Sequence, residues 1–449
     1  MLQRIICCVL FGVLTAEFSW MFEEHWSTPW HYVADFLFAP LPGIHLWVLD
    51  GLFVVFLLIG RSQKGAMTGR AKPMHTAIWV SLGTIFTFAI WGAINGAKVL
   101  DMRIQLHAIV MMMLASFMYM ATFRTPEHFR MLGATIVYAA LFRVTMMFLF
   151  YILVMRNLTV YIAVITDHGD SILFVLAIVI MIANAIHTKE KSTTWKAVLV
   201  TMAMLWAIQM NNRRLAWVGL IGSLLIIYFL LPTGPVRRKI HRGLMTAAPI
   251  LALYVAVGWT SPTGFFKPIA SIQSMNDAKD PSTESRNLEN IGLIVTLQKN
   301  PLIAEGFGHE YVEVSTTYSA GLVFPQYKMV PHNSVLGIAA FTGMVGFCGI
   351  WLMFPVAVYL AARSYAFSRS GLEKSIAMVT ICEVLVHINQ MWGDIGINAS
   401  QGVVLMSAAF AAAARAPLWS GAWPGGKKAK ARAKSAAPSP APSPSPRAA

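Results

Sequence analysis

Charged side chains are scarce in this sequence. Only 12% of its 449 residues are Asp, Glu, Lys or Arg, against roughly 25% in an average soluble domain, while 57% are hydrophobic. So few charges do not provide enough polar surface to cover a globule of this size. This composition argues against a soluble enzyme, a disordered protein and a fibrous protein alike.

Cysteine is also scarce. Cys7 and Cys8 are adjacent, Cys348 and Cys382 lie in apolar runs, and no C-x-x-C spacing occurs. This pattern contains neither a disulfide framework nor a zinc signature. We expect four thiols embedded in a membrane.

The sequence contains many long apolar stretches. A helix needs about 17 to 25 residues to cross a bilayer, and stretches of this kind recur along the chain. We therefore expect an all-α polytopic integral membrane protein with about 12 transmembrane helices. The expected ranges are 4–22, 44–60, 74–93, 104–123, 131–155, 171–187, 195–210, 214–231, 243–260, 333–361, 375–391 and 399–415.

The lysines and arginines support this arrangement, because they fall mainly on alternate connections. With a cytoplasmic N-terminus, every cytoplasmic segment is basic, including the short ones at 124–130 and 189–196, as the positive-inside rule requires. The opposite side is net acidic. The formal net charge of +15, from 35 Lys and Arg against 20 Asp and Glu, therefore indicates topology, and we expect no nucleic-acid partner.

Two segments are not expected to cross the membrane. Residues 1–421 would form the membrane domain, and residues 422–449, basic and then rich in Pro, Ser and Ala, a disordered cytoplasmic tail near anionic lipid headgroups. The loop 261–331 would lie on the outer side, and a loop this long usually has a function.

The outer loop contains one predicted helix. Asp280 is a suitable N-cap before a proline at position 281, and the helix would run to Lys299. Leu288, Ile291 and Val295 would form its apolar stripe. Such a short amphipathic helix would lie on the membrane or cap a cavity.

Polar side chains at or inside a membrane cost free energy unless they are paired or hydrated, so they are the candidates for chemistry. Most of them gather on the outer side of the expected topology. The candidates are Arg213 and Arg214 at a helix start, His168 in a loop, Arg286 in the loop helix, His332 and Asn333 before a helix, Asp394 after one, and Glu383 and His387 inside one.

Each candidate also has a purely structural interpretation. Paired arginines such as Arg213 and Arg214 can extend to lipid headgroups. Asn333 or Ser334 can cap the helix that follows His332, and Arg286 can face solvent on the side opposite the apolar stripe.

Taken together, the outer residues favour a functional site. Arginine binds diphosphate oxygens through paired hydrogen bonds and stays charged, which suits an anionic lipid substrate. A histidine near its neutral form can accept a proton from a sugar hydroxyl. No acidic metal cluster is evident there beyond Asp167 and Asp170, so we expect no metal and no other cofactor.

Three segments, NNRRLAWVGL, STESRNLENIGLIVTLQKNPLIAEGFGHEY and PHNSVLGIAAFTGMVGF, follow one another between about residues 205 and 350. They resemble the core of the O-antigen ligase and O-antigen polymerase superfamily. The resemblance covers about a third of the chain, and the order and spacing are more specific than any one motif. Twelve spans with a large outer loop between the ninth and tenth also resemble the ligase architecture.

The resemblance implies roles for individual residues. Arg214 corresponds to the arginine that opens a span in the family, with Arg213 where a small polar residue is usual. Arg286 corresponds to the arginine of the periplasmic helix, and His332 to the proposed catalytic histidine. In the family, the periplasmic helix ends in a turn that contains a small Gly-x pair. This sequence has Ala304 and Glu305 there.

The resemblance also implies a metal-independent glycosyltransferase in the bacterial inner membrane, with both termini cytoplasmic and its active site facing the periplasm. The donor would be an undecaprenyl-diphosphate-linked glycan, and Asn333, His168 and Asp394 are candidate accessory residues. Lipid A–core as acceptor would make the protein a ligase, and a second lipid-linked glycan would make it a polymerase. The sequence leaves this choice open, and membrane lipids would be further partners.

A secondary transporter is the alternative from another class. Glu383 and His387 are four residues apart on one helix face, where they can hold helices together, act as accessory site residues or form a proton relay. Against a transporter, the sequence has no internal repeat, and its charges concentrate at the outer mouth of the spans, not at the midplane.

Overall fold

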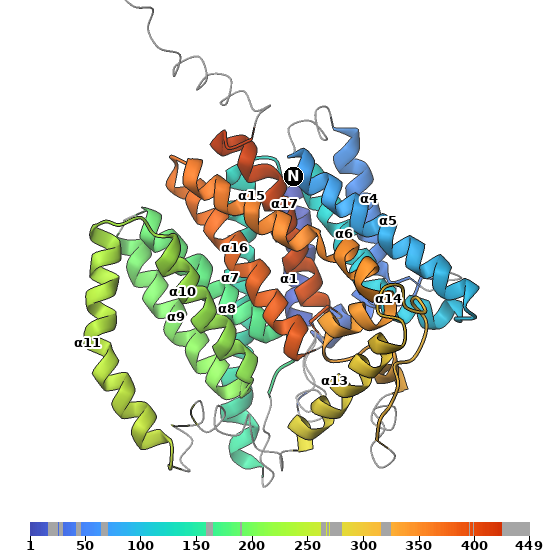
Figure 1. Cartoon of the computed structure of the whole chain (residues 1–449). Helices are drawn as coiled ribbons and strands as arrows, with labels where there is room; N and C mark the ends of the chain where they lie inside the picture. Colours follow the sequence, from blue (N-terminus) through green and yellow to red (C-terminus); the bar gives the residue numbers. More distant parts are fainter. Residues whose placement is uncertain are drawn as a thin grey trace, which may run out of the picture.

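The computed structural model (Figure 1) describes residues 1–16, 26, 30–41, 46–63, 71–158, 165–188, 191–261, 266, 269, 281–315, 325–394, 396–397 and 399–423. Within these residues the protein is helical, apart from an isolated β-bridge between Pro40 and Trp47. The expected tail lies almost entirely outside the described residues, as does the expected N-cap Asp280.

The helices follow the expected ranges closely. They are α1 (Leu2–Ala16), α3 (His31–Leu37), α4 (Val48–Ser62), α5 (Lys72–Ile94), α6 (Val99–Thr122), α7 (Pro126–Leu153), α8 (Gly169–Thr188), α9 (Lys191–Asn211), α10 (Arg214–Leu230), α11 (Pro235–Gly258), α13 (Pro281–Lys299), α14 (Ser334–Trp351), α15 (Met353–Phe367), α16 (Gly371–Gly393) and α17 (Ser400–Ser420), with short 3₁₀ turns η1 (Met155–Asn157) and η5 (Pro325–Lys328). In the described part of the chain, seven helical segments are long and apolar enough to cross a membrane. The protein is therefore a polytopic membrane protein, while the count of twelve spans stays a prediction.

The centre of the bundle is α17. Residues 401–417 are all buried, because α6, α15 and α16 surround the helix. At the other extreme α11 stands at the edge of the molecule (Figure 1), and most of its side chains are exposed. Exposure of apolar side chains is expected for a helix that faces lipid, since lipid tails are as apolar as leucine.

The span expected at 333–361 corresponds to one candidate membrane span, Ser334–Phe367, but its helix is interrupted and forms α14 and α15. Gly343 has a φ of 64° inside α14, a backbone conformation that favours glycine. The kink frees two amides, and the N–H groups of Met344 and Val345 donate to the carbonyls of Pro301 and Leu302 at 2.9 and 3.2 Å. The outer loop thus completes the hydrogen bonding of the broken helix.

The buried face of the loop helix is not its expected apolar stripe. In α13 the buried residues are Glu289, Gly292 and Leu293, whereas Ile291 is 49% exposed. The helix packs against α14, and the backbone of Val312 approaches Gly292 so closely that a Cβ there would overlap it. The face of α13 that packs inward therefore contains the small Gly292 and the polar Glu289 beside Leu293.

An ion pair in the core joins α7 to α8. Nε of Arg143 lies 2.8 Å from Oδ1 of Asp170, and both side chains are fully buried. Arg143 lies inside the span expected at 131–155 and Asp170 just before the span expected at 171–187, and the structure pairs them.

Replacing Asp170 by leucine is expected to lower the free energy of unfolding by about 3–5 kcal/mol, because it leaves the Arg143 charge buried without compensation. The double variant Arg143→Met/Asp170→Leu should be much closer to the wild type, since it removes both charges. Thermal unfolding in detergent measures both variants. A single variant no less stable than the double one would show that the pair does not matter for folding.

Candidate functional site

Asp394, directly after α16, is the centre of a charged cluster. Its carboxylate bonds Nδ1 of His168, which precedes α8, and accepts from Nε2 of Gln390 at 3.3 Å. Nη2 of Arg286, from α13, lies 3.9 Å from its Oδ1. Asp394 is only 2% exposed, so three segments distant in sequence meet at one buried carboxylate.

The charges of this cluster determine its ionisation. Burial raises the pKa of Asp394, but the hydrogen bond and charge of His168, together with the charges of Arg213 and Arg286, outweigh burial and bring the pKa below its ordinary value. Asp394 is therefore a stable anion, and the two arginines share it as a counterion.

Arg213 and Arg214 are positioned by a tight turn between α9 and α10. Asn212 adopts a left-handed conformation with a φ of 51°, which asparagine tolerates better than most residues. The buried Asn211 fixes the turn, because its Oδ1 accepts from the N–H of Thr166 at 3.1 Å. Arg213 is the N-cap residue of α10, and Arg214 is the first residue of that helix.

Arg213 is coupled to the cluster by charge. Burial lowers the pKa of its guanidinium, the carboxylates of Asp394 and Asp167 raise it, and the charge of Arg286 lowers it again. Arg213 therefore lies within electrostatic range of Arg286. The resemblance gave the main role to Arg214, whereas the geometry adds Arg213 as an equal candidate.

A second group of side chains surrounds His332. Its Nδ1 lies 2.8 Å from Oε2 of Glu289 on α13, and the N–H of Asn333 donates to the other oxygen of Glu289 at 3.2 Å. Glu289 is 6% exposed, and the ring of Tyr327 lies 4.9 Å from the His332 ring. When Nδ1 donates to Glu289, Nε2 is left as a proton acceptor. His332 therefore has the environment of a general base held by a carboxylate.

Asn333 has the capping role expected of it and one more. Its Oδ1 accepts from the N–H of Leu336 at 3.1 Å in the first turn of α14, and its Nδ2 donates to Oδ1 of Asn290 at 3.0 Å. The start of α14 is thereby tied to α13.

Helix α13 brings the two groups together. Arg286 and Glu289 are three residues apart on it, so they occupy one face with Cβ atoms about 5–6 Å apart. One of them contacts Asp394 and the other contacts His332. α13 thus connects the group around Asp394, which includes His168 and Arg286, to the group around His332. Together the two groups make up the candidate site.

Glu289 and Asn290 were not recognised in the sequence. A signal existed in the spacing, because Arg286, Glu289 and Leu293 recur at intervals of three and four residues along α13. The apolar residues Leu288, Ile291 and Val295 form a competing pattern at the same spacing on another face.

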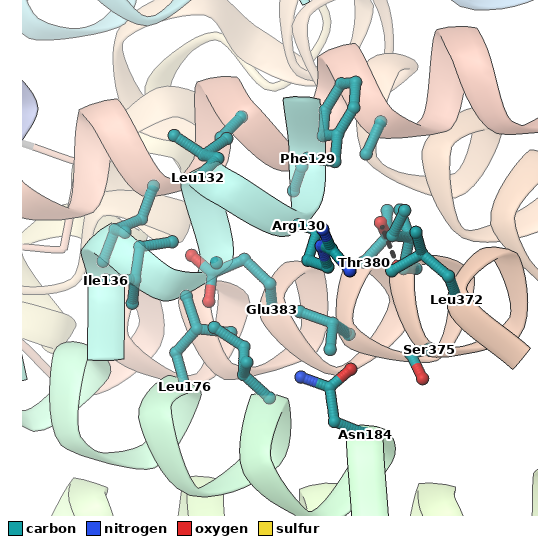
Figure 2. A pocket seen from close by; sticks show the side chains of 18 residues that line it. Phe129, Arg130, Leu132, Ile136, Leu176, Asn184, Leu372, Ser375, Thr380 and Glu383 are labelled. Carbon is teal, nitrogen blue, oxygen red and sulfur yellow. Dashed lines mark hydrogen bonds between the residues drawn. The ribbon is translucent and has the colours of Figure 1, made fainter. Parts of the chain in front are cut away.

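Glu383 and His387 lie apart from this site. Glu383 faces a small, mostly apolar cavity of about 80 Å³ between α7, α8, α16 and α17 (Figure 2), with Arg130 and Asn184 farther along its wall. Within the described residues, neither its carboxylate oxygens nor the ring nitrogens of His387 have a hydrogen-bond partner. The two side chains therefore do not bond each other, contrary to the interpretation of a satisfied pair that holds helices together.

Within the described ranges, no group of three or more His, Cys, Asp and Glu side chains is arranged to hold a metal ion. The site consists of arginines, histidines and single carboxylates, which suits an anionic substrate.

A known family matches the part of the chain that contains most of these residues. Residues 198–351 match the family model described as O-antigen ligase. The chain carries an O-antigen ligase domain. This domain spans α10, α13 and α14, and hence Arg213, Arg214, Arg286, Glu289 and His332, while His168 and Asp394 are supplied by the surrounding membrane helices. Among curated proteins, none matches the chain.

The domain implies a glycosyltransferase-type enzyme of surface polysaccharide assembly, a ligase or a polymerase, with lipid-linked glycans as its substrates. Its extent agrees with the resemblance found at 205–350. Both the family and the membrane character expected from the sequence are confirmed.

Proposed function

We propose that the protein transfers a glycan from undecaprenyl diphosphate to an acceptor hydroxyl on the periplasmic side of the inner membrane. One observation carries the proposal: α13 places Arg286 and Glu289 one turn apart, so that a shared arginine cluster lies beside a carboxylate-held histidine. Anion binding and proton acceptance are the two functions that such a transfer requires.

The reaction would be an inverting displacement. Nε2 of His332 accepts the proton of the acceptor hydroxyl as its oxygen attacks the anomeric carbon of the donor sugar. The bond from that carbon to the diphosphate oxygen breaks, and its electron pair leaves with the diphosphate. Glu289 holds the imidazole in one tautomer and stabilises the positive charge that forms on it.

The arginines would stabilise the leaving group. Negative charge grows on the diphosphate in the transition state, and guanidinium groups already in place stabilise it without reorganisation. Asp394 keeps Arg286 and Arg213 oriented before substrate binds. The energy of the reaction is in the donor bond, so neither a nucleotide nor a metal would be needed, and activity should survive chelation of divalent cations.

The position of Glu383 and His387 supports a transferase over a transporter. A relay needs a connected pair, and these two side chains make no bond to each other in the described part of the chain. The charged residues converge instead at the end of the bundle that carries the O-antigen ligase domain.

Cells that lack the protein test the proposal. Their surface glycan should disappear, and lipid-linked glycan should accumulate: long chains identify a ligase, and single repeats identify a polymerase. An unchanged surface glycan in those cells would contradict the proposal. Loss of uptake of a solute on Glu383→Gln, with normal glycan, would support the transporter.

Glu289→Gln is expected to slow transfer by about 100-fold without reducing the amount of folded protein. Glutamine keeps the size of the side chain, but it cannot stabilise the imidazolium or enforce the tautomer of His332. Glu284→Gln, on an exposed position of the same helix, is the matched control. Equal rates for the two variants would remove Glu289 from the mechanism.

A further inference from the structure

A second polar cavity lies between the N-terminal parts of α4, α6 and α17. Its volume is about 220 Å³, more than ten times the roughly 10–15 Å³ that one water molecule needs. Its polar lining consists of Trp47, Asp50, Arg103, His107 and Ser400, and the rest is apolar.

This cavity lies at the same end of the bundle as His332. Nε2 of Gln105, on α6, donates to the carbonyls of His309 and Met329, at 2.9 and 3.0 Å, and Met329 is three residues before His332. Arg103 and His107 lie on the opposite side of α6 from Gln105. The cavity is therefore about one helix width, roughly 10 Å, from the loop that holds His332.

Asp50 lines the cavity, and one of its carboxylate oxygens has no hydrogen-bond partner among the described residues. Its Oδ2 accepts from the N–H of Trp47 at 2.8 Å and contacts Nε2 of His107 at 2.8 Å. Its side chain is 3% exposed, and within the described residues Oδ1 has no hydrogen-bond partner. A buried acceptor without a partner is costly, so a ligand that donates a hydrogen bond would stabilise it.

The remaining lining groups define the ligand. Arg103 and His107 are one turn apart on α6 and both line the cavity, and the guanidinium of Arg103 is a hydrogen-bond donor. The Trp47 ring, 4.3 Å from the His107 ring, provides an aromatic wall. Because the lining contains both the carboxylate of Asp50 and the guanidinium of Arg103, neither a bare phosphate nor a bare ammonium group suits both, whereas a sugar ring offers hydroxyl donors, oxygen acceptors and an apolar face.

We infer that the Asp50–Arg103 cavity binds a saccharide unit of a glycan substrate, one or more sugars away from the reacting bond. The inference rests on the proposed glycan transfer. Hydroxyl groups of the saccharide donate to Oδ1 of Asp50, and Arg103 donates to its oxygens. Either the acceptor or the distal part of the donor glycan supplies this chemistry.

Binding to the purified full-length protein in detergent tests the inference separately from activity. The probes are lipid-linked glycan from cells that carry His332→Ala and glycan-free lipopolysaccharide from cells that lack the protein. Stabilisation against heat reports binding. Asp50→Asn should weaken the binding of one probe about tenfold, as expected for a lost hydrogen bond to a charged group, and leave the other unchanged. The affected probe identifies the source of the saccharide.

A second variant and a control complete the design. Ala108→Phe, which fills the cavity from α6, should weaken the same probe. Asp35→Asn removes a carboxylate that is 58% exposed and paired with His31, and it should bind both probes normally. Wild-type binding of both probes by Asp50→Asn or by Ala108→Phe, or no binding by the wild type, would overturn the inference. Unchanged surface glycan in cells that lack the protein would instead overturn the proposed function, whatever the cavity binds.

Discussion

Replacing His332 by alanine is expected to lower the rate of glycan transfer by about 10²–10⁴-fold, the usual contribution of a positioned general base. The side chain is 22% exposed and bonds one carboxylate oxygen at 2.8 Å, so its loss should not prevent insertion or folding. Cells with this variant should accumulate lipid-linked glycan and lack surface glycan, while the amount of protein in the membrane stays normal.

His309→Ala is the matched control for this variant. His309 belongs to the same loop and also lies near a glutamate, with Nδ1 3.9 Å from Oε2 of Glu305, but it has no contact with Glu289. Its variant should transfer glycan within a few-fold of the wild-type rate. Surface glycan at the wild-type level in cells with His332→Ala would show that His332 is not the base.

Replacing Arg286 by alanine is expected to cost about 10²–10³ in kcat, the effect of removing one preorganised group that stabilises developing charge. Lysine at this position should restore only part of the rate, because it cannot form the paired hydrogen bonds of a guanidinium. Lys299→Ala, at the other end of α13, removes an exposed positive charge and should have little effect.

The second arginine should couple to the first. Arg213 and Arg286 both interact with Asp394, so the losses from Arg213→Ala and Arg286→Ala should not be additive in the double variant. The same comparison with Arg214→Ala determines which arginine of the pair takes part. A kcat unchanged in Arg286→Ala, with only the KM for the acceptor raised, would contradict binding of the leaving group by this cluster.

Local patterns in the sequence predicted much of the fold. Apolar length alone predicted the span ranges, and Pro281 with Lys299 predicted the limits of α13. Gly306 and Gly308 adopt positive φ angles, 97° and 96°, a backbone conformation that favours glycine. Each of these features depends on residues that are close together in the chain.

The parts that failed depend on contacts between distant residues. Glu289 bonds a histidine 43 positions away, and no local pattern predicts that meeting. The break at Gly343 depends on carbonyls of Pro301 and Leu302 in the outer loop, which the sequence does not place beside α14. The same holds for the core pair of Arg143 and Asp170, which comes from two different spans.

In the candidate site, too, the residue types could be predicted locally, whereas the contacts between distant residues could not. The residue types at the outer ends of the spans predicted Arg286, His332 and Asp394 as members of a site. Their grouping around α13 required the structure, because one helix in the loop supplies a contact to each half.

Transfer by the purified protein in proteoliposomes tests the central claim most directly. The donor is the lipid-linked glycan that accumulates in cells with His332→Ala, the acceptor comes from the same membranes, and neither nucleotide sugar nor divalent metal is added. The wild type should join glycan to acceptor and release one undecaprenyl diphosphate for each glycan transferred, while the Arg286→Ala and His332→Ala proteins should do neither. Transfer that requires a nucleotide sugar, or that proceeds at equal rates in all three proteins, would contradict the account.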